Sequence, residues 1–175
     1  MQQMNGNIVP TPSMSFGDAV KTCFKKYATF SGRARRSEFW WFYLALWVVN
    51  AVLSGLLSHF ASAKAAVVAE AYSNMGSLET LNSLADKESS LANINLVLMI
   101  IMGIWALATL LPTLAAMARR LHDTGKSGHL LWLFLLCGIG GLIPLIMCIG
   151  EGTPGPNQYG ESPKYKPAAP NAPQV

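Results

Sequence analysis

RRLHDTGKSG, residues 119–128, is a polar stretch between two long apolar runs, and it decides the fold. The runs extend from Ser89 to Ala118 and from His129 to Gly150. A second basic cluster, GRARRSE at residues 32–38, stands directly before a further apolar run. We expect both clusters to lie on the same side of a membrane and to form one polar site.

Charged residues are scarce in this chain and unevenly placed. They make up 13% of its 175 residues, whereas soluble domains carry about 25%. Asp, Glu, Lys and Arg are all missing from segments 39–63, 89–118 and 127–150, and each segment exceeds the ~20 residues that cross a bilayer core. A soluble helical domain would have too little polar surface to cover three helices that are apolar all round. The sequence therefore predicts an all-α, polytopic membrane protein.

Residues 15–27 are predicted to form an amphipathic helix at the membrane surface. Ser15 and Asp18 have the spacing of an N-terminal capping box. Apolar side chains recur on one face and lysines on the other: Phe16, Val20, Cys23, Phe24 and Tyr27 against Lys21, Lys25 and Lys26. A basic polar face suits the lipid headgroup plane, and packing on another protein surface is the alternative. Residues 1–14 are expected to form a flexible tail.

Three membrane spans are expected, at residues 39–59, 94–118 and 129–149. The first begins with the aromatic cluster FWWFY, which is typical of a membrane interface. Pro112 should kink the second span by removing one backbone hydrogen bond, and Gly125 should cap its C-terminal end. Residues 60–93 are more polar and are expected to form a solvated extramembrane loop, in which 63–72 is helix-prone and 78–91 could form a second short helix.

The third apolar run contains four helix-breaking residues, Gly138, Gly140, Gly141 and Pro144. We interpret the run as one full crossing. The alternative is a re-entrant hairpin that turns at residues 138–141. Each arm would then have about nine residues, or ~13 Å of helix, which is less than half of the bilayer core. The backbone at such a turn would have to be buried in protein.

The distribution of Lys and Arg predicts the orientation in the membrane. Residues 1–38 contain six of them, 59–93 two, 119–129 three and 150–175 two. Because cytoplasmic segments are enriched in Lys and Arg, we expect a cytoplasmic N-terminus and, with three crossings, an external C-terminus. The membrane domain would extend over residues 15–163, followed by a disordered, Pro-rich tail at 164–175.

Three motifs, in this order, resemble those of a known family. FSGRARRSEFW at residues 30–40, RRLHDTGKSG at 119–128 and EGTPGPNQYG at 151–160 are similar to motifs of domain-of-unknown-function family 805, which consists of bacterial inner-membrane proteins. The similarity covers roughly residues 15–163. It implies a location in the bacterial inner (cytoplasmic) membrane and implies no activity. The long connector at 61–93 departs from the family pattern, as does His129, where the family commonly has an aromatic residue.

The charges in the first two motifs oppose the dipoles of the helices that carry them. Arginines precede the first span, whose N-terminal end is already positive, and an aspartate lies at the negative end of the second. Both placements become favourable if the antiparallel helices bring the charges together. We therefore predict that Asp123 binds Arg35 or Arg36, and that Glu38 binds one of the arginines at 119 and 120. The predicted polar cluster comprises Arg33, Arg35, Arg36, Glu38, Arg119, Arg120, His122, Asp123 and Lys126.

This polar cluster has two leading interpretations. The first is a structural staple that fixes the orientation of the helices. The second is an anion-binding site, because five arginines and Lys126 outnumber Glu38 and Asp123, and a helix N-terminus offers free N–H groups. An anionic lipid headgroup is the expected ligand, since basic clusters beside a membrane attract such lipids. The expected partner is therefore the lipid bilayer itself.

Other classes of function have less support in the sequence. His122, Asp123 and Glu38 are possible acid–base groups, but no nucleophile motif or metal-ligand spacing accompanies them, so no enzyme, metal or cofactor is predicted. The three cysteines are too widely spaced for a disulfide framework. Transport is the alternative function and would require a small homo-oligomeric transporter or channel, yet no charged residue lies at mid-membrane depth. Nucleic-acid binding is not expected, because no recognition helix is evident.

Overall fold

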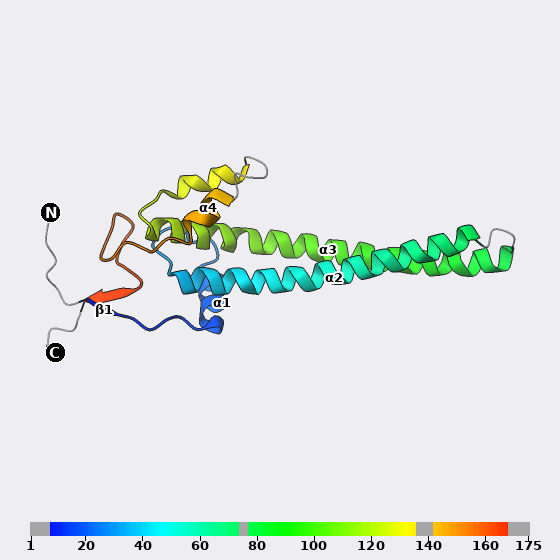
Figure 1. Cartoon of the computed structure of the whole chain (residues 1–175), viewed down its shortest axis with the longest axis horizontal. Coiled ribbons are helices and arrows are strands. Elements are labelled where there is room, and N and C mark those ends of the chain that lie inside the picture. Colours follow the sequence, from blue (N-terminus) through cyan, green and yellow to red (C-terminus); the bar gives the residue numbers. More distant parts are fainter. Residues whose placement is uncertain (1–7, 74–76, 136–141, 168–175) are drawn as a thin grey trace. The chain divides into compact units, whose positions relative to one another are not determined.

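The structure is a computed structural model that describes residues 8–73, 77–135 and 142–167. Its elements follow the order β1 (Ile8–Pro10), α1 (Phe16–Lys25), α2 (Arg36–Ser73), α3 (Leu78–Asp123), the 3₁₀-helix η1 (Gly128–Leu135), α4 (Leu142–Met147) and β2 (Tyr165–Pro167) (Figure 1). Apart from two three-residue strands, the described elements are helical, which agrees with the predicted fold class. The chain divides into two compact units, residues 1–45 with 110–175 and residues 46–109.

Helix α1 begins at the predicted cap and packs against the first turns of α2. The Ser15 hydroxyl accepts a hydrogen bond from the Asp18 N–H at 3.2 Å and donates one to the Asp18 carboxylate at 2.7 Å. Phe24 meets Phe42 of α2 edge-to-face, with ring centroids 5.6 Å apart. The helix ends at Lys25, two residues earlier than expected. Its apolar face therefore covers the start of α2.

The C-terminal end of α3 is closed by a glycine, as the sequence predicts. Gly125 has a φ of +74°, a conformation that side chains with a Cβ rarely adopt. Its N–H donates to the carbonyl of His122 at 3.0 Å, and the N–H of Lys126 donates to that of Leu121 at 2.9 Å. These bonds satisfy two of the last helical carbonyls. Pro112 lies inside α3, which continues on both sides of it.

The third apolar run forms two short helices, η1 and α4, that contact each other. Near its start, Gly128 lies beside the His122 ring. Near its end, the carbonyl of Cys148 accepts a hydrogen bond from Arg120 Nε at 3.0 Å. Both ends of the run thus lie against the same end of α3, which does not fit the single crossing predicted for residues 129–149. The expected turning point at 138–141, like Cys137, lies outside the described residues.

The two ends of the described chain meet in a small antiparallel sheet. Strand β1 pairs with β2 in the register Ile8 with Pro167, Val9 with Lys166 and Pro10 with Tyr165. Beyond the strand, the N–H of Thr11 donates to the carbonyl of Lys164 at 2.8 Å. Segments joined by backbone hydrogen bonds cannot lie on opposite sides of a membrane. The prediction of an external C-terminus with a cytoplasmic N-terminus is therefore wrong, and parts of both predicted tails are ordered strands.

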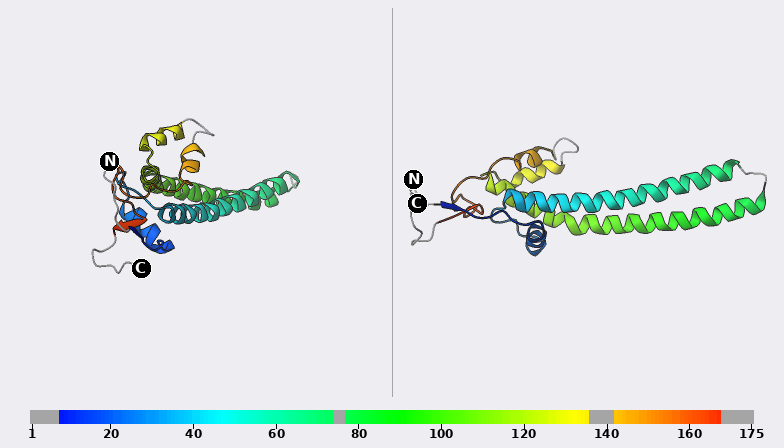
Figure 2. Two further views of the ribbon diagram at one scale, coloured as in Figure 1. Left: turned by 60° about the vertical axis from the view of Figure 1, so that its left-hand side comes forward. Right: turned by 60° about the horizontal axis from the view of Figure 1, so that its bottom comes forward.

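In the second unit, α2 and α3 run side by side and antiparallel over residues 46–73 and 78–109 (Figure 2). Residues 60–93, expected outside the membrane with helix-prone stretches at 63–72 and 78–91, are mostly helical, because α2 ends only at Ser73 and α3 begins at Leu78. The less exposed positions of α3 recur at 81, 84, 88 and 91. This heptad spacing keeps one seam of a helix against its neighbour. The Lys64 Nζ and Glu88 Oε1 atoms, 3.2 Å apart, join the two helices.

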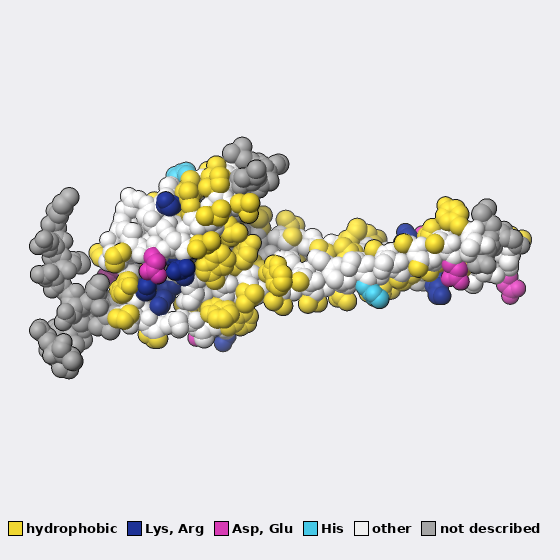
Figure 3. Space-filling model, viewed as in Figure 1, with side chains coloured by type: hydrophobic (Ala, Val, Ile, Leu, Met, Phe, Trp, Pro, Cys, Tyr) yellow, Lys and Arg dark blue, Asp and Glu magenta, His cyan; other side chains and the backbone are white. Residues whose placement is uncertain are grey.

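Both long helices have the length and composition to span a membrane. Helix α2 has 38 residues and α3 has 46, or ~57 Å and ~69 Å of helix against a hydrocarbon core of ~30 Å. Side chains such as Trp47, Ile104 and Leu107 are 64%, 64% and 71% exposed, and Figure 3 shows hydrophobic side chains over the visible face. So apolar a surface suits lipid rather than water. The structure thus supports two of the three predicted spans.

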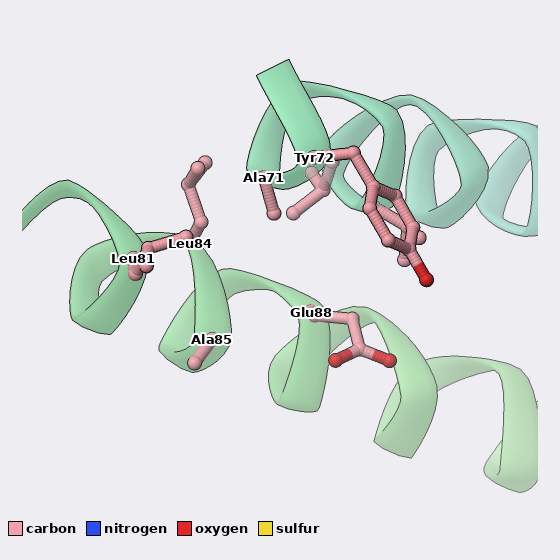
Figure 4. Close-up of a pocket in the computed structure, with 8 residues that line it drawn as sticks. Ala71, Tyr72, Leu81, Leu84, Ala85 and Glu88 are labelled. Atoms are coloured by element: carbon pink, nitrogen blue, oxygen red, sulfur yellow. The ribbon is translucent and has the colours of Figure 1, made fainter. Parts of the chain in front are cut away.

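An apolar pocket of about 380 Å³ opens between α2 and α3 near the ends that their connection joins. Figure 4 shows Leu81 and Leu84 of α3 facing the pocket beside Ala71 and Tyr72 of α2, with the Glu88 carboxylate at its edge. Tyr72 is 74% exposed. The pocket consists entirely of residues of the second unit.

We predict that the N- and C-termini lie on the same side of the membrane, because β1 pairs with β2. Alkaline phosphatase and green fluorescent protein, each fused to either terminus, should report one common compartment. The same reporters inserted between Ser73 and Leu78 should report the opposite compartment, since α2 is one crossing. Opposite compartments for the two termini would contradict the strand pairing.

Candidate functional site

A buried ion cluster forms where the segment before α2 meets the end of α3. The Ala34 N–H donates to the Arg119 carbonyl at 3.0 Å and holds this segment against α3. Arg33 then reaches Asp123, with its Nε and Nη2 atoms 2.9 and 2.8 Å from Oδ1. The two side chains are 1% and 6% exposed. The prediction that Asp123 binds the arginine at position 35 or 36 is wrong, because the backbone contact at Ala34 directs Arg33 toward α3 instead.

Arg120 binds the same carboxylate from within α3. Its Nη1 donates to Asp123 Oδ2, its Nε to the carbonyl of Cys148 at 3.0 Å, and its Nη2 to the carbonyl of Gly150. The residue is completely buried. Because the guanidinium is planar, these partners fix its orientation. Arg120 therefore joins the end of α3 to the segment that follows α4.

A second buried ion pair joins the start of α2 to α3. The prediction that Glu38 binds Arg119 or Arg120 is confirmed for Arg119, whose Nη2 lies 3.2 Å from Glu38 Oε1. Both side chains are less than 5% exposed. Within the described chain no side-chain nitrogen of Arg119 makes a hydrogen bond. The positive charge of this buried guanidinium is therefore balanced by the Glu38 carboxylate.

Cys23 of α1 lies on the other side of Glu38, with its sulfur 4.0 Å from Oε1. Burial, followed by the negative charge of Glu38, raises the pKa of the Cys23 thiol to about 12. The thiol is thus protonated at neutral pH and directs its weak S–H donor toward the carboxylate. This contact ties α1 to the ion cluster.

The third sequence motif, residues 151–160, closes over the ion cluster. The Thr153 N–H donates to the Asp123 carbonyl at 2.8 Å, and Asn157 Nδ2 donates to the His122 carbonyl at 2.9 Å. These bonds satisfy carbonyls that α3 leaves free at its end. Gly152 passes so close to the Asp123 carboxylate that a Cβ atom would overlap it. The sequence identified this turn-rich motif but did not indicate that it contacts the cluster.

His122 has a structural role in this arrangement. Its ring stacks on Tyr159, with centroids 3.8 Å apart and an angle of 5° between the planes. Its Nδ1 lies 3.1 Å from the Gly32 carbonyl, and a carbonyl only accepts, so Nδ1 carries the proton in this contact. No nucleophile contacts the ring in the described structure. His122 therefore links the segment before α2 to the closing segment.

The remaining predicted cations lie outside the buried ion cluster. Arg35 donates to the hydroxyl and the carbonyl of Thr11 at 2.8 and 3.0 Å, and Lys126 is exposed. Arg36 Nη1 and Lys164 Nζ each lie 3.2 Å from the carboxylate of Glu151. Arg36, Lys164 and Glu151 form what we call the outer basic pocket. It is a cavity of about 190 Å³ that Arg35, Arg120 and Asp123 also line.

The electrostatics of the outer basic pocket differ from those of the buried cluster. The pKa of Glu151 is lowered, first by the hydrogen bond from Lys164 and then by its charge. The Glu151 side chain is 67% exposed, so water and salt screen these ion pairs. An external anion can therefore compete for Arg36 and Lys164, whereas the buried arginines are already committed to protein atoms. Within the described residues, no group of three His, Cys, Asp or Glu side chains could hold a metal ion.

We predict strong coupling between Glu38 and Arg119. Replacing Glu38 by Gln should cost ~3–5 kcal/mol, because an uncompensated guanidinium then remains buried, whereas Glu38→Gln with Arg119→Met should cost much less. Reversible unfolding in mixed micelles of all four variants gives the coupling directly. Additive effects of the two changes would mean that the pair does not form.

We also predict that Gly152→Ala destabilises the protein, because the added methyl group would displace the Asp123 carboxylate from its arginines. The matched control is Gly17→Ala in α1, where a Cβ meets no atom within 4 Å and helix propensity favours alanine by up to ~1 kcal/mol. Melting temperatures in detergent should fall for the first variant and stay equal or rise for the second. Equal melting temperatures for the Gly152 variant and the wild type would argue against the close approach.

Comparison with known proteins places this arrangement in a family. The inner membrane protein YhaI of Escherichia coli K12 is 33% identical over 149 residues, which cover 81% of this chain and 91% of YhaI. The inner membrane protein YhaH of the same strain is 34% identical over 143 residues, covering 82% and 93%. No solved structure matches the chain. Residues 27–161, which contain all three motifs, match the family described as "Protein of unknown function (DUF805)". The chain therefore belongs to the DUF805 family.

Proposed function

We propose that this chain is a bacterial inner-membrane protein that presents a cytoplasmic binding surface for anionic lipid headgroups. In this proposal the buried ion cluster is the staple that shapes the surface, and the outer basic pocket is the part that meets the headgroups. The relatives YhaI and YhaH are inner membrane proteins, which supports the location. Two long, exposed, apolar helices support it independently.

The proposed topology has two crossings and a re-entrant hairpin. Helices α2 and α3 cross the membrane, while η1 and α4 enter and leave it on the same side. Every Lys and Arg except Lys64 and Lys87 then lies on one side, which by the positive-inside rule is the cytoplasm. Both termini are cytoplasmic in this arrangement. Helix α1 lies in the headgroup plane with its lysines toward the lipid phosphates.

The observation that carries the proposal is the position of Glu151 in the outer basic pocket. Its carboxylate lies 3.2 Å from both Arg36 and Lys164, where a ligand phosphate would have the same two partners. Because these side chains are between 41% and 67% exposed, the carboxylate is easily exchanged for another anion. A lipid phosphate at the membrane surface is an anion at high local concentration. Glu151 thus acts as an internal competitor that weakens binding.

A small homo-oligomeric transporter has less support. Residues 39–59 of α2 and 94–118 of α3 contain no charged side chain, although ion and proton pathways generally require one inside the membrane. The charged residues of the described first unit gather at the ends of these segments instead. This distribution favours contact with headgroups over conduction.

We predict that Arg36→Ala and Lys164→Ala each lower the preference for anionic lipid about 5-fold, and that Glu151→Gln raises it by a similar factor, since one basic residue near the surface corresponds to roughly this change. The protein is reconstituted in bilayers with equal amounts of phosphatidylglycerol and phosphatidylcholine. Native mass spectrometry then measures the ratio of the two lipids that remain bound. The effects should shrink at high salt.

The matched control for this experiment is Lys64→Ala, since Lys64 forms a comparable half-exposed ion pair with Glu88 at 3.2 Å but belongs to the second unit. Its lipid ratio should equal that of the wild type. If Arg36→Ala, Lys164→Ala and Lys64→Ala all give the wild-type ratio, headgroup binding at the outer basic pocket is ruled out.

A further inference from the structure

We infer that the first unit holds the hydrocarbon chains of one phospholipid in a groove between α3 and η1. The groove has a volume of about 790 Å³. Leu114 and Met117 of α3 form its floor, Leu131 and Trp132 of η1 form one wall, and Phe30 and Tyr159 lie at its cytoplasmic end. This inference rests on the proposed membrane topology, but it does not depend on a preference for anionic headgroups.

The depth of the groove matches the position of a lipid chain. It extends along α3 from Leu110 to His122, which is about 18 Å at 1.5 Å per residue. Arg119 and Glu38 lie near the His122 end and mark the membrane edge in the proposed topology. Leu110 is nine residues deeper, or ~13 Å, which is close to the middle of a ~30 Å core. The groove therefore crosses one leaflet in the direction in which acyl chains lie.

The length of the groove favours hydrocarbon chains over a partner helix. Its lining extends along α3 for ~18 Å, whereas a transmembrane helix of another protein has to cover a core of ~30 Å. The chains of one leaflet match the shorter length, and flexible chains can fill the space without moving η1.

Chemically, the mouth of the groove suits a phospholipid headgroup. Its cytoplasmic end is lined by Ser127 and His129, whose Oγ and Nδ1 atoms are 2.7 Å apart. Both residues are exposed, as is the neighbouring Lys126. A hydroxyl, an imidazole and an ammonium group together can bind the phosphate that phospholipids of every class carry. The rest of the lining is mainly apolar. The headgroup of one lipid would therefore lie at the polar end of the groove and its acyl chains along the apolar part.

Two local features shape the end of the groove next to His122. Gly128 lies where a Cβ would come within 3.1 Å of His122 Nε2, so η1 starts close to α3. His122 is held at the end of the groove by its stacking on Tyr159 and by the Gly32 carbonyl. The side chains that shape this end are thus fixed by the ion cluster region rather than by the lipid.

The test uses a phosphatidylcholine that carries a diazirine on one acyl chain, in bilayers of unlabelled phosphatidylcholine. This probe is zwitterionic, so its binding does not depend on a preference for anionic headgroups. It therefore tests the groove independently of the outer basic pocket. After irradiation of the wild-type protein, crosslinks should concentrate on residues 110–118 and 128–133. The opposite face of α3 around Ile101, 45% exposed, should show the lower level expected of ordinary bilayer contact. Equal labelling of the two regions would overturn the inference.

The second measurement is the number of phospholipids retained after transfer to detergent, read by native mass spectrometry. The wild type should retain one phosphatidylcholine. Leu114→Trp fills the groove and should lower retention about tenfold, equivalent to the loss of some two buried methylene groups. Leu131→Trp on the opposite wall should do the same. The control Ile101→Trp, at a 45% exposed position on the opposite face of α3, should leave retention unchanged.

The outcomes separate this inference from the proposed function. If Arg36→Ala has no effect on the lipid ratio but Leu114→Trp abolishes retention, the results support a lipid chain in the groove. They then contradict headgroup binding at the outer basic pocket. If retention by both groove variants equals that of Ile101→Trp, no lipid chain is held in the groove. A groove variant that fails to fold is recognised by its melting temperature, and the wild-type crosslinks then decide alone.

Discussion

The carboxylate of Asp123 is shared by Arg33 and Arg120, and the arrangement of the first unit depends on this shared charge. Arg33 brings in the segment before α2, and Arg120 brings in the segment after α4. Removing ions from water costs several kcal/mol for each, so the stability of Asp123 and its two arginines depends on the partners that backbone and side chains supply to them. The cluster gives the protein a defined geometry more than it adds net stability. The closing segment at residues 151–160 completes this shell.

The sequence predicted the elements around this cluster better than their connections. Charge-free segments revealed α2 and α3, and capping residues located the start of α1 and the end of α3. The predicted pairing of Glu38 with a neighbouring arginine is correct, because both lie on helices whose faces follow from helical spacing. The partner of Asp123 was missed, since Arg33 precedes α2 and its direction depends on one backbone hydrogen bond from Ala34. A backbone hydrogen bond of this kind cannot be predicted from the type of residue that makes it.

The third apolar run shows where hydrophobicity alone misleads. Its length suffices for a crossing, yet both of its ends lie against the same end of α3. The contact that holds the second end there joins residues far apart in the chain, since Arg120 donates to the carbonyls of Cys148 and Gly150. Likewise, the pairing of β1 with β2 rests on three residues at each end. Neither strand is long enough to give a recognisable alternating pattern.

Because α2 packs against α3 in heptads, the length of these two helices can change independently of the chemistry at their ends. The seam repeats every seven residues, so one heptad can be added to or removed from both helices while the remaining contacts keep their register. The ion cluster, the outer basic pocket and the groove all belong to the first unit and would not sense such a change. The length of α2 and α3 that extends outside the bilayer can therefore vary freely. Evolution can lengthen or shorten it to suit a thicker envelope or another neighbour without altering the chemistry of the first unit.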